Sequence, residues 1–452
     1  MDGTEGQRFG IEADVDGTPC PPQILRWMAT LPEDLLHILD VLNQHGHGAW
    51  LVGGCVRDAW LDQSPTDIDI CTTCPPEETM ELFGAQAIAT GLEFGTITLK
   101  GHGQHYEATT LRTESMYRDG RRPEHVEWGT SLNDDLSRRD FTINSMAIDV
   151  ARRELYDPFD GQKDLQNQTV RAVGEATLRC QEDALRILRA YRFLSRGEGP
   201  LWTLESSLHQ AVLENRARLD MVAIERRWSE ASKIICSPHA GELLHRMSAD
   251  GILSYVFEHQ HIEHALMTVL DEPRLKQLTL YQRLGVLFLN QTTKSVVQQL
   301  KGLRTSREMQ RATATFHEAL HHVPLSNKGA MRVFRHVMAG DAHAHLLACS
   351  VLSERGLYST NADTFFGSTQ EALDAWSHLE PQRSPPTSLV DGHWIMARTG
   401  IEQGMRLGRL KDWLHRIQIE EDLSEARQLE QRLSRLAYEH GDHASWPRLE
   451  FP

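Results

Sequence analysis

The sequence predicts an α+β protein, in which a small mixed α/β domain precedes a long all-helical region. Over the first third of the chain, short strand-like runs such as residues 49–52 and 106–111 alternate with helical patterns. After Gly174 the apolar residues recur at helical spacing, as Leu185 and Leu188 do. From about residue 236 onward, nearly every segment between prolines is compatible with a helix.

The elements of the first domain follow from the N-terminus onward. Residues 31–44 carry leucines at helical spacing and predict an amphipathic helix. Residues 49–52, 66–70, 95–99 and 106–111 predict short strands, because they are apolar runs bounded by glycine-marked turns. A further helix is expected to begin near Pro76, with acidic residues in its first turn.

Composition sets limits on the class of protein. The 452 residues suffice for two to four domains, and 40% hydrophobic with 24% charged residues is typical of a soluble globular protein. No apolar stretch approaches the roughly 20 residues that cross a membrane. Residues 1–22 are acidic and lack an apolar core, so we expect a disordered tail and neither a secretory signal nor a transit peptide.

The cysteines and histidines give no clear metal motif. Seven scattered cysteines fit reduced thiols and a cytoplasmic location. Cys71 and Cys74 form a lone CxxC without a second ligand pair nearby, which favours small residues filling a turn. His45 and His47 lack the HExxH spacing, and we expect them at the surface.

Arginines are concentrated in one part of the chain although the net charge is −16. Phosphate binding depends on local patches of charge and not on the total. A solvated face is the alternative, but many of these arginines lie in segments with helix or strand patterns. The arginines of this stretch are Arg112, Arg118, Arg121, Arg122, Arg138, Arg139, Arg152, Arg153, Arg171, Arg179, Arg186, Arg189, Arg192 and Arg196.

Two short motifs suggest a nucleotide site. Asp67 and Asp69 lie two apart in a presumed strand, so both carboxylates are expected on one face, where a cation such as Mg²⁺ would relieve their repulsion. Gly53 and Gly54 follow a buried strand and allow close approach of a phosphate, with Arg57 one helical turn on. Each motif alone is common by chance, and a loop-edge Asp pair and a tight turn are the alternatives. Together they favour a nucleoside triphosphate site.

These segments resemble the class II tRNA nucleotidyltransferases, which are the CCA-adding enzymes, and their bacterial poly(A) polymerase relatives. GGCVRD (53–58) and PTDIDI (65–70) resemble the catalytic core of the family. Four further segments resemble it in the same order: RTESMYRDGRRPEHVEW (112–128), RRDFTINSMAID (138–149), EDALRILRAYRF (182–193) and ERRWSE (225–230). The resemblance covers residues 49–235 and continues faintly beyond, and the ordered set is far more specific than any single motif.

The resemblance implies a fold and a division into domains. The head would be a nucleotidyltransferase domain like that of DNA polymerase beta, followed by an extended all-α neck, body and tail. The expected boundaries are a disordered N-terminal tail over 1–22, a catalytic head over 23–170, a neck over 171–237, a body over 238–350 and a tRNA-binding C-terminal tail over 351–452.

The resemblance also implies an activity and its residues. CCA would be added without a template to the 3′ end of tRNA from CTP and ATP, by two-metal transfer with release of pyrophosphate. Asp67 and Asp69 would hold Mg²⁺, and Glu107 would be a third catalytic carboxylate, with a solvent-facing strand glutamate as the alternative. Asp140 and Asn144 would hold the sugar or brace the fold. The expected nucleotide-binding residues are Gly53, Gly54, Arg57, Arg139, Asp140, Asn144, Asp183, Arg186, Arg189 and Arg192.

Asp183 and Arg186 are expected to select the base. Three residues apart on a presumed helix, they would be neighbours on one face. A carboxylate accepts from the exocyclic amine of cytosine or adenine, and a guanidinium donates to the ring nitrogen. Uracil and guanine present the reverse polarity and would leave buried groups unpaired. An ordinary salt bridge on a solvated helix is the alternative.

Several specificities remain open from the sequence. Residues 113–125 are polar and turn-rich, so we expect a mobile loop, with a surface hairpin as the alternative. The resemblance implies that the presence of this loop favours addition of the final A. A poly(A) polymerase or a specialist that adds only CC or A would share the same motifs. A non-catalytic RNA-binding protein is the alternative from another class. The sequence does not define the oligomeric state.

Overall fold

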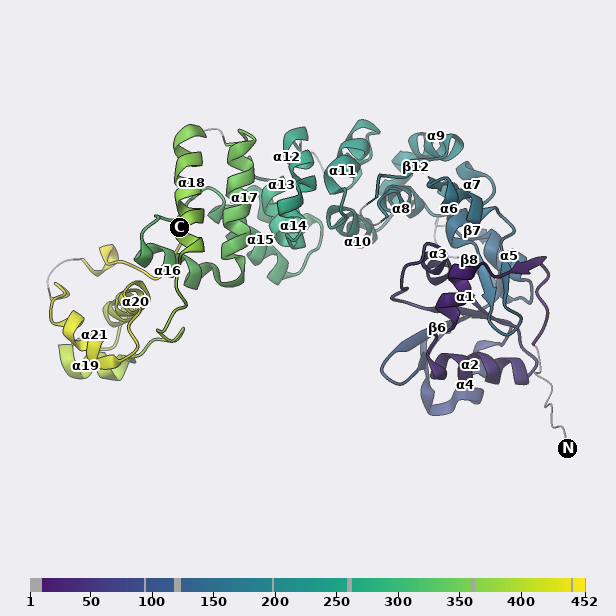
Figure 1. The fold of residues 1–452 in the computed structure, drawn as a ribbon, viewed down its shortest axis with the longest axis horizontal. Coiled ribbons are helices and arrows are strands. Elements are labelled where there is room, and N and C mark those ends of the chain that lie inside the picture. The colour runs from purple at the N-terminus through teal and green to yellow at the C-terminus, as the bar shows by residue number, and fades with distance from the viewer. Residues whose placement is uncertain are drawn as a thin grey trace. The chain divides into compact units, whose positions relative to one another are not determined.

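A computed structural model of the chain describes residues 10–92, 95–117, 123–196, 199–257, 262–358, 362–439 and 442–451. The chain forms two compact units (Figure 1). The first comprises Met1–Ala231 with Asp250–Tyr255, and the second comprises Ser232–Ala249 with Val256–Pro452. Strands gather in the purple-to-blue first unit, and the green-to-yellow part of the chain is drawn as helices (Figure 1). This agrees with the predicted α+β class.

An eight-stranded mixed sheet is the centre of the first unit. Its neighbouring strands are antiparallel except for one parallel pair, β3 with β6. The strands lie in the order β1 (Gly17–Pro19), β10 (Glu154–Tyr156), β9 (Ala147–Asp149), β2 (Ala49–Val52), β3 (Asp69–Thr72), β6 (His105–Thr110), β5 (Thr96–Lys100) and β4 (Ala87–Gly91). The four residues of β2 are all buried, as expected for a central strand.

Short helices pack against this sheet and connect its strands. The helix predicted over residues 31–44 is confirmed as α2 (Glu33–Gln44), and the one predicted near Pro76 as α4 (Pro76–Phe83). The remaining helices of the domain are α1 (Pro22–Met28), α3 (Gly54–Trp60), α5 (Leu132–Ser137) and α6 (Gly161–Gln166). A buried cluster that includes Trp50, Val52 and Tyr156 packs against α5 through Leu132 and Leu136.

The N-terminal segment differs from the prediction. The expected disordered tail through residue 22 is wrong for residues 10–22, because β1 pairs with β10 at one edge of the sheet. Arg152 also donates to the Gly10 carbonyl at 2.8 Å, and Asp14 accepts from the Ser131 hydroxyl at 2.6 Å. The acidic composition therefore did not prevent order, since the sheet edge and an arginine supply partners for this segment.

The described residues of the segment expected to be a mobile loop lie in two strands. β7 (Arg112–Tyr117) and β8 (Pro123–Trp128) form an antiparallel hairpin, which was the alternative for residues 113–125. The tip of the predicted loop, residues 118–122, lies outside the described residues.

Helices that follow the sheet domain complete the first unit and form the second. α7 (Ala176–Glu182), α8 (Leu185–Leu194) and α9 (Ser206–Asn215) lie in the first unit, and α10 (Ile224–Ile235) runs across the division. A two-residue parallel pairing joins β11 (Thr169–Val170) to β12 (Thr203–Leu204). The second unit contains α11 (Ala240–Ala249), α12 (His264–Thr268), α13 (Leu280–Leu287), α14 (Thr293–Gly302), α15 (Arg307–Ala319), α16 (Lys328–Met338), α17 (Ala342–Glu354), α18 (Ala362–Ser377), α19 (Gly392–Thr399), α20 (Met405–Glu420) and α21 (Ala426–Leu433).

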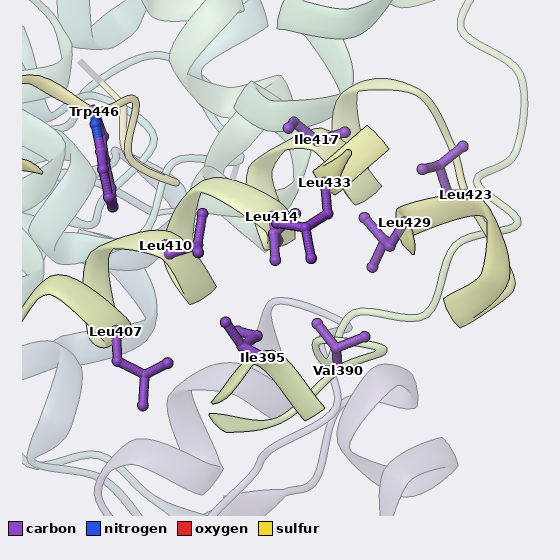
Figure 2. Close-up of a cluster of buried hydrophobic side chains, with 10 residues drawn as sticks. All are labelled: Val390, Ile395, Leu407, Leu410, Leu414, Ile417, Leu423, Leu429, Leu433 and Trp446. Carbon is purple, nitrogen blue, oxygen red and sulfur yellow. The ribbon is translucent and has the colours of Figure 1, made fainter. Parts of the chain in front are cut away.

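The last part of the second unit has its own hydrophobic cluster. Side chains of α19, α20 and α21 meet there, with Ile395, Leu410 and Leu414 fully buried (Figure 2). Trp446, beyond the last helix, lies at one end of the cluster. Among the described helices, none combines the length and the apolar character needed to cross a bilayer.

Candidate active site

A cavity of about 710 Å³ opens in the first unit, between the sheet and α8. Every residue that the sequence singled out for catalysis or nucleotide binding lines it. These residues are Gly53, Gly54, Arg57, Asp67, Asp69, Glu107, Arg139, Asp140, Asn144, Asp183, Arg186, Arg189 and Arg192. Seven arginines and five carboxylates are among the lining residues, so the cavity is locally positive although the chain is acidic.

Three carboxylates form one side of this cavity. Asp69 and Glu107 are partners in register across the parallel pair of β3 and β6. The predicted strand over residues 66–70 is shifted, because β3 begins only at Asp69 and Asp67 lies in the irregular segment before it. Burial raises the pKa of Asp69, and the charges of Glu107 and Asp67 raise it further against the opposing effect of Arg139. The carboxylates are thus near enough to repel one another.

This acidic side fits a divalent cation. Its donor atoms are carboxylate oxygens, which hard cations prefer, and a cation would relieve the repulsion that raises the pKa of Asp69. Asp67 and Glu107 are exposed and line the cavity, so a cation could bind them without displacing another side chain. The residues present therefore fit a metal site of this kind.

The glycine pair forms the turn from β2 into α3. Gly53 has a φ of +75°, which L side chains rarely adopt, and its backbone N–H donates to the Met146 carbonyl at 3.2 Å. A Cβ at Gly53 would lie 2.9 Å from Nη1 of Arg139. Glycine is therefore required both by the backbone and by the close approach of this guanidinium.

The Arg57 side chain is held by hydrogen bonds to neighbouring residues. Its Nε and Nη2 donate to the two carboxylate oxygens of Asp58 at 2.8 and 3.0 Å, and its Nη1 donates to Oδ1 of Asn144. Asn144 in turn donates from Nδ2 to Asp140 at 3.0 Å. With only 7% of its surface exposed, Arg57 is fixed in orientation before any ligand binds.

Asp140 links the sheet domain to α8. Its Oδ2 accepts from Nε of Arg189 at 2.8 Å, and its Oδ1 accepts from the backbone N–H of Phe141 at 2.8 Å. Burial alone would raise the pKa of Asp140, but Arg189 and Asn144 stabilise the carboxylate and lower it to about 2. Asp140 is therefore ionised at neutral pH and acts as a counter-ion for Arg189.

Arg139 is held in a similar way by a buried aspartate. Asp135, which is 1% exposed, accepts from Nη2 of Arg139 at 3.0 Å and from Nε of Arg138 at 3.1 Å. Burial works against the charged forms, yet the mutual attraction lowers the pKa of Asp135 and raises that of Arg139. Arg138 and Arg139 thus both line the cavity while buried Asp135 holds their guanidinium groups.

Asp183 and Arg186 both line the cavity, but they do not share one helical face as predicted. α7 ends at Glu182 and α8 begins at Leu185, and Asp183 between them has extended backbone angles. Its side chain accepts from the N–H of Leu185 at 3.0 Å. A short carboxylate just before a helix can satisfy the free N–H groups of the first turn, which favours a position outside the helix for Asp183.

Asp183 and Arg186 each have a different partner in this structure. Nη2 of Arg226 donates to Asp183 at 2.8 Å. Arg186 donates to Glu182 at 3.0 Å and to the carbonyl of Arg138 at 2.8 Å. Among the described contacts, Asp183 and Arg186 therefore do not form the salt bridge that was the alternative.

Other functional residues were not singled out from the sequence. Glu230 accepts from Nε of Arg192 at 2.6 Å and lies 3.8 Å from Arg189, so ERRWSE supplies both Glu230 and Arg226. The spacing of four between Arg226 and Glu230 was a usable signal, since it puts both on one face of α10. Asp135 gave no such signal.

Phe193 is the centre of a group of arginines. The guanidinium carbons of Arg192, Arg196, Arg57 and Arg189 lie 4.1, 4.7, 5.3 and 5.4 Å from its ring centroid. Burial and the nearby charge of Arg57 lower the pKa of Arg196 to about 9. This concentration of positive charge against an aromatic face would attract an anion.

The fold and this site together define a nucleotidyltransferase head followed by a helical region. Residues 49–171 match the poly A polymerase head domain, and residues 203–263 match the domain described as a probable RNA and SrmB-binding site of polymerase A. The chain belongs to the family of CCA-adding enzymes. It is 32% identical over 391 residues to the CCA-adding enzyme of Lactobacillus johnsonii, a match that covers 85% of this chain and 92% of that enzyme.

Another relative and a solved structure are also similar to this chain. The CCA-adding enzyme of Lactobacillus helveticus is 44% identical over 203 residues, which is 45% of this chain and 50% of that enzyme. The chain thus spans about half the length of this relative in that match. The crystal structure of the Bacillus stearothermophilus CCA-adding enzyme in complex with CTP is similar in fold, with a TM-score of 0.69, 24% identity and coverage of 92% of this chain and 98% of that chain.

Proposed function

We propose that the protein adds CCA to the 3′ end of tRNA without a nucleic-acid template, using CTP and ATP and releasing pyrophosphate. Membership of the CCA-adding family supports this function. The observation that carries it is one cavity lined by the acidic residues Asp67 and Asp69, by the triphosphate-binding candidates and by Asp183 with Arg186. Transfer, substrate binding and base selection then share a single site.

Asp67 and Asp69 would hold Mg²⁺, with Glu107 beside them as a third carboxylate. When bound, such ions activate an attacking hydroxyl and neutralise the charge of a leaving pyrophosphate. Burial raises the pKa of Asp69, and the charges of Glu107 and Asp67 raise it further, which supports this assignment because a cation would offset both costs. The exposure of Glu107 leaves it free to turn toward the same ion.

The arginines that line the same cavity would bind the triphosphate. Arg139, Arg189 and Arg192 are each held by a buried carboxylate, so they would bind phosphate without a large loss of side-chain entropy. Gly54 would let the backbone approach the phosphates closely. Arg57 joins this group through its link to Asn144.

Asp140 and Asn144 are best assigned a bracing role. Both are largely buried, and their polar atoms bind Arg189 and Arg57. The alternative role, in which they hold the sugar of the nucleotide, would require at least part of these hydrogen bonds to be replaced. We therefore place them among the residues that fix the arginines and not among those that contact the substrate first.

Asp183 and Arg186 would select cytosine and adenine by the polarity of their hydrogen bonds. In this structure Asp183 is bound by Arg226 and Arg186 by Glu182. A base would replace these partners only if it offers an amine to Asp183 and an acceptor nitrogen to Arg186. Uracil and guanine cannot do so and would leave both groups unpaired in the cavity.

The helical remainder would bind the acceptor stem of tRNA by its shape. The match of residues 203–263 to an RNA-binding domain supports this assignment. We retain the division into a head over 23–170, a neck over 171–237, a body over 238–350 and a tRNA-binding tail over 351–452 as part of the proposal. Recognition would depend on backbone contacts, since RNA duplexes are bound mainly through shape and phosphates.

An incubation with tRNA that lacks its 3′ CCA tests the function. The protein is supplied with Mg²⁺ and each labelled triphosphate alone or in mixtures, and the products are separated by size. We expect CCA from CTP with ATP and no incorporation of UTP or GTP. A long A-tail, a product that stops at CC, or no incorporation would each contradict the proposal.

A further inference from the structure

A second group of potential metal ligands lies at the far end of β3. His47, Cys74 and Glu78 each offer one ligand atom, and these atoms all lie within 4.8 Å of one another. Within the described part of the chain, no other group of three or more histidines, cysteines or carboxylates is this close. The three residues come from the loop after α2, the turn after β3 and the first turn of α4.

Backbone contacts fix the two segments that carry His47 and Cys74. The N–H of Thr73 donates to the Gly48 carbonyl at 3.0 Å, and the N–H of Gly48 donates to Oγ1 of Thr73 at 2.9 Å. Oγ1 of Thr72 also donates to the Gly48 carbonyl at 2.7 Å. These reciprocal bonds hold the residue before Cys74 against the residue after His47, so the ligands are positioned without help from an ion.

The donor set has a definite chemistry. Nε2 of His47 lies 2.9 Å from Oε1 of Glu78, and Cys74 is fully buried beside them. Sulfur and imidazole nitrogen are ligands of zinc and similar ions, whereas magnesium and calcium prefer oxygen alone. The side chain of Glu78 is 44% exposed and that of His47 15%, so an ion can reach the group from solvent.

We propose that His47, Cys74 and Glu78 form a zinc-binding site with water as a fourth ligand. The site is separate from the acidic side of the catalytic cavity. Asp69 begins β3 and Cys74 lies two residues beyond its last residue, Thr72, so the length of the strand, about 10 Å, lies between the two sites. The ion therefore takes no part in transfer and instead ties β3 to α4 and to the loop before β2.

Cobalt binding to the full-length protein tests this site. Co²⁺ takes the place of Zn²⁺ in such sites, and a bound thiolate gives a sulfur-to-cobalt charge-transfer band in the near ultraviolet. Because the carboxylate site contains no sulfur, any metal bound there contributes nothing to the band. We expect the band to saturate at one Co²⁺ per chain and to disappear when Zn²⁺ is added.

Matched variants assign the ligands. Cys74→Ser should abolish the band, and His47→Gln and Glu78→Gln should weaken Co²⁺ binding at least about tenfold. Glu77→Gln, in the same helical turn, and Cys236→Ser, which removes an exposed thiol, should bind as the unaltered protein does. Since His47 and Glu78 are partly exposed, their variants keep the test valid if Cys74→Ser does not fold. Absence of the band, its loss in Cys236→Ser, or unchanged binding in both His47→Gln and Glu78→Gln would overturn the proposal.

Discussion

The arginines and the carboxylates that line the cavity balance their charges in opposite ways. On the arginine side, buried carboxylates such as Asp135, Asp140 and Glu230 each bind one or more guanidinium groups. On the acidic side, no ion pair within the described residues joins Asp67, Asp69 or Glu107 to a cation. The arginines are therefore already fixed for a ligand, whereas the carboxylates still need a cation to relieve their repulsion.

The largest effect is expected on the acidic side. Asp69→Asn should lower the single-turnover rate of nucleotide transfer roughly 10³-fold or more, because metal-ion stabilisation of the transition state is worth several kcal/mol. Glu107→Gln should lower the transfer rate less, by about tenfold, because Glu107 is more exposed than Asp69 and would hold the ion less firmly. Equal losses in the two variants would give Glu107 the same role as Asp69, and an unchanged rate in Asp69→Asn would remove the acidic side from catalysis.

The next effect is expected in base selection. Asp183→Ala should reduce the preference for CTP and ATP over UTP and GTP by about 10- to 100-fold, the value of one or two unpaired buried polar groups. The variant should still transfer nucleotides to tRNA, because Asp67 and Asp69 are unchanged. The ratio of kcat/KM for CTP and UTP measures this effect. A variant that keeps the original preference would exclude Asp183 from base selection.

The arginine side also predicts a dependence of stability on pH. The pKa of Asp140 is about 2 in the folded protein against 3.8 as its ordinary value. A lowered pKa contributes stability that is fully present above about pH 4 and is lost as the pH falls toward about 2, here about 2 kcal/mol. The free energy of unfolding of the unaltered protein should therefore fall more steeply over this range than that of Asp140→Asn. Parallel curves for the two proteins would contradict the ionised state assigned to Asp140.

The smallest effect is expected at Glu230, which binds Arg192 and lies near Arg189 but is not among the residues that line the cavity. Glu230→Gln should raise the KM for nucleotides about tenfold with little change in kcat, because it weakens a charge-assisted hydrogen bond worth roughly 1.5 kcal/mol. Glu214→Gln, an exposed change on α9, is the matched control. A fall in kcat with unchanged KM would show that Glu230 acts on the chemical step instead of on the arginines.

The sequence predicted the residues of the cavity better than their partners. Glycine pairs, Asp-x-Asp and the RRD segment are local motifs, so Gly53, Asp69 and Arg139 could be found without a structure. Asp135 could not, because its role follows from the packing of α5 below the sheet. Asp183 was placed on a helix because its neighbours are helix-compatible, but its carboxylate caps α8 from outside.

Contacts between distant segments were also hidden from the sequence. β1 pairs with β10, more than 130 residues later, and composition cannot show such a partner, so composition alone predicts disorder. His47 and Cys74 were assigned to the surface and to a turn, because ligands from three segments leave no motif at fixed spacing. In both cases the decisive partner lies in another part of the fold.

One pair of measurements on one variant tests the division between the two sides most directly. Asp67→Asn combined with Asp69→Asn should bind CTP within about threefold of the unaltered protein, because the arginines proposed to bind the triphosphate remain in place. Single-turnover transfer of CMP to tRNA should be lost in the same sample. Transfer that persists in this variant, or a loss of CTP binding as large as that caused by Arg189→Met, would contradict the account.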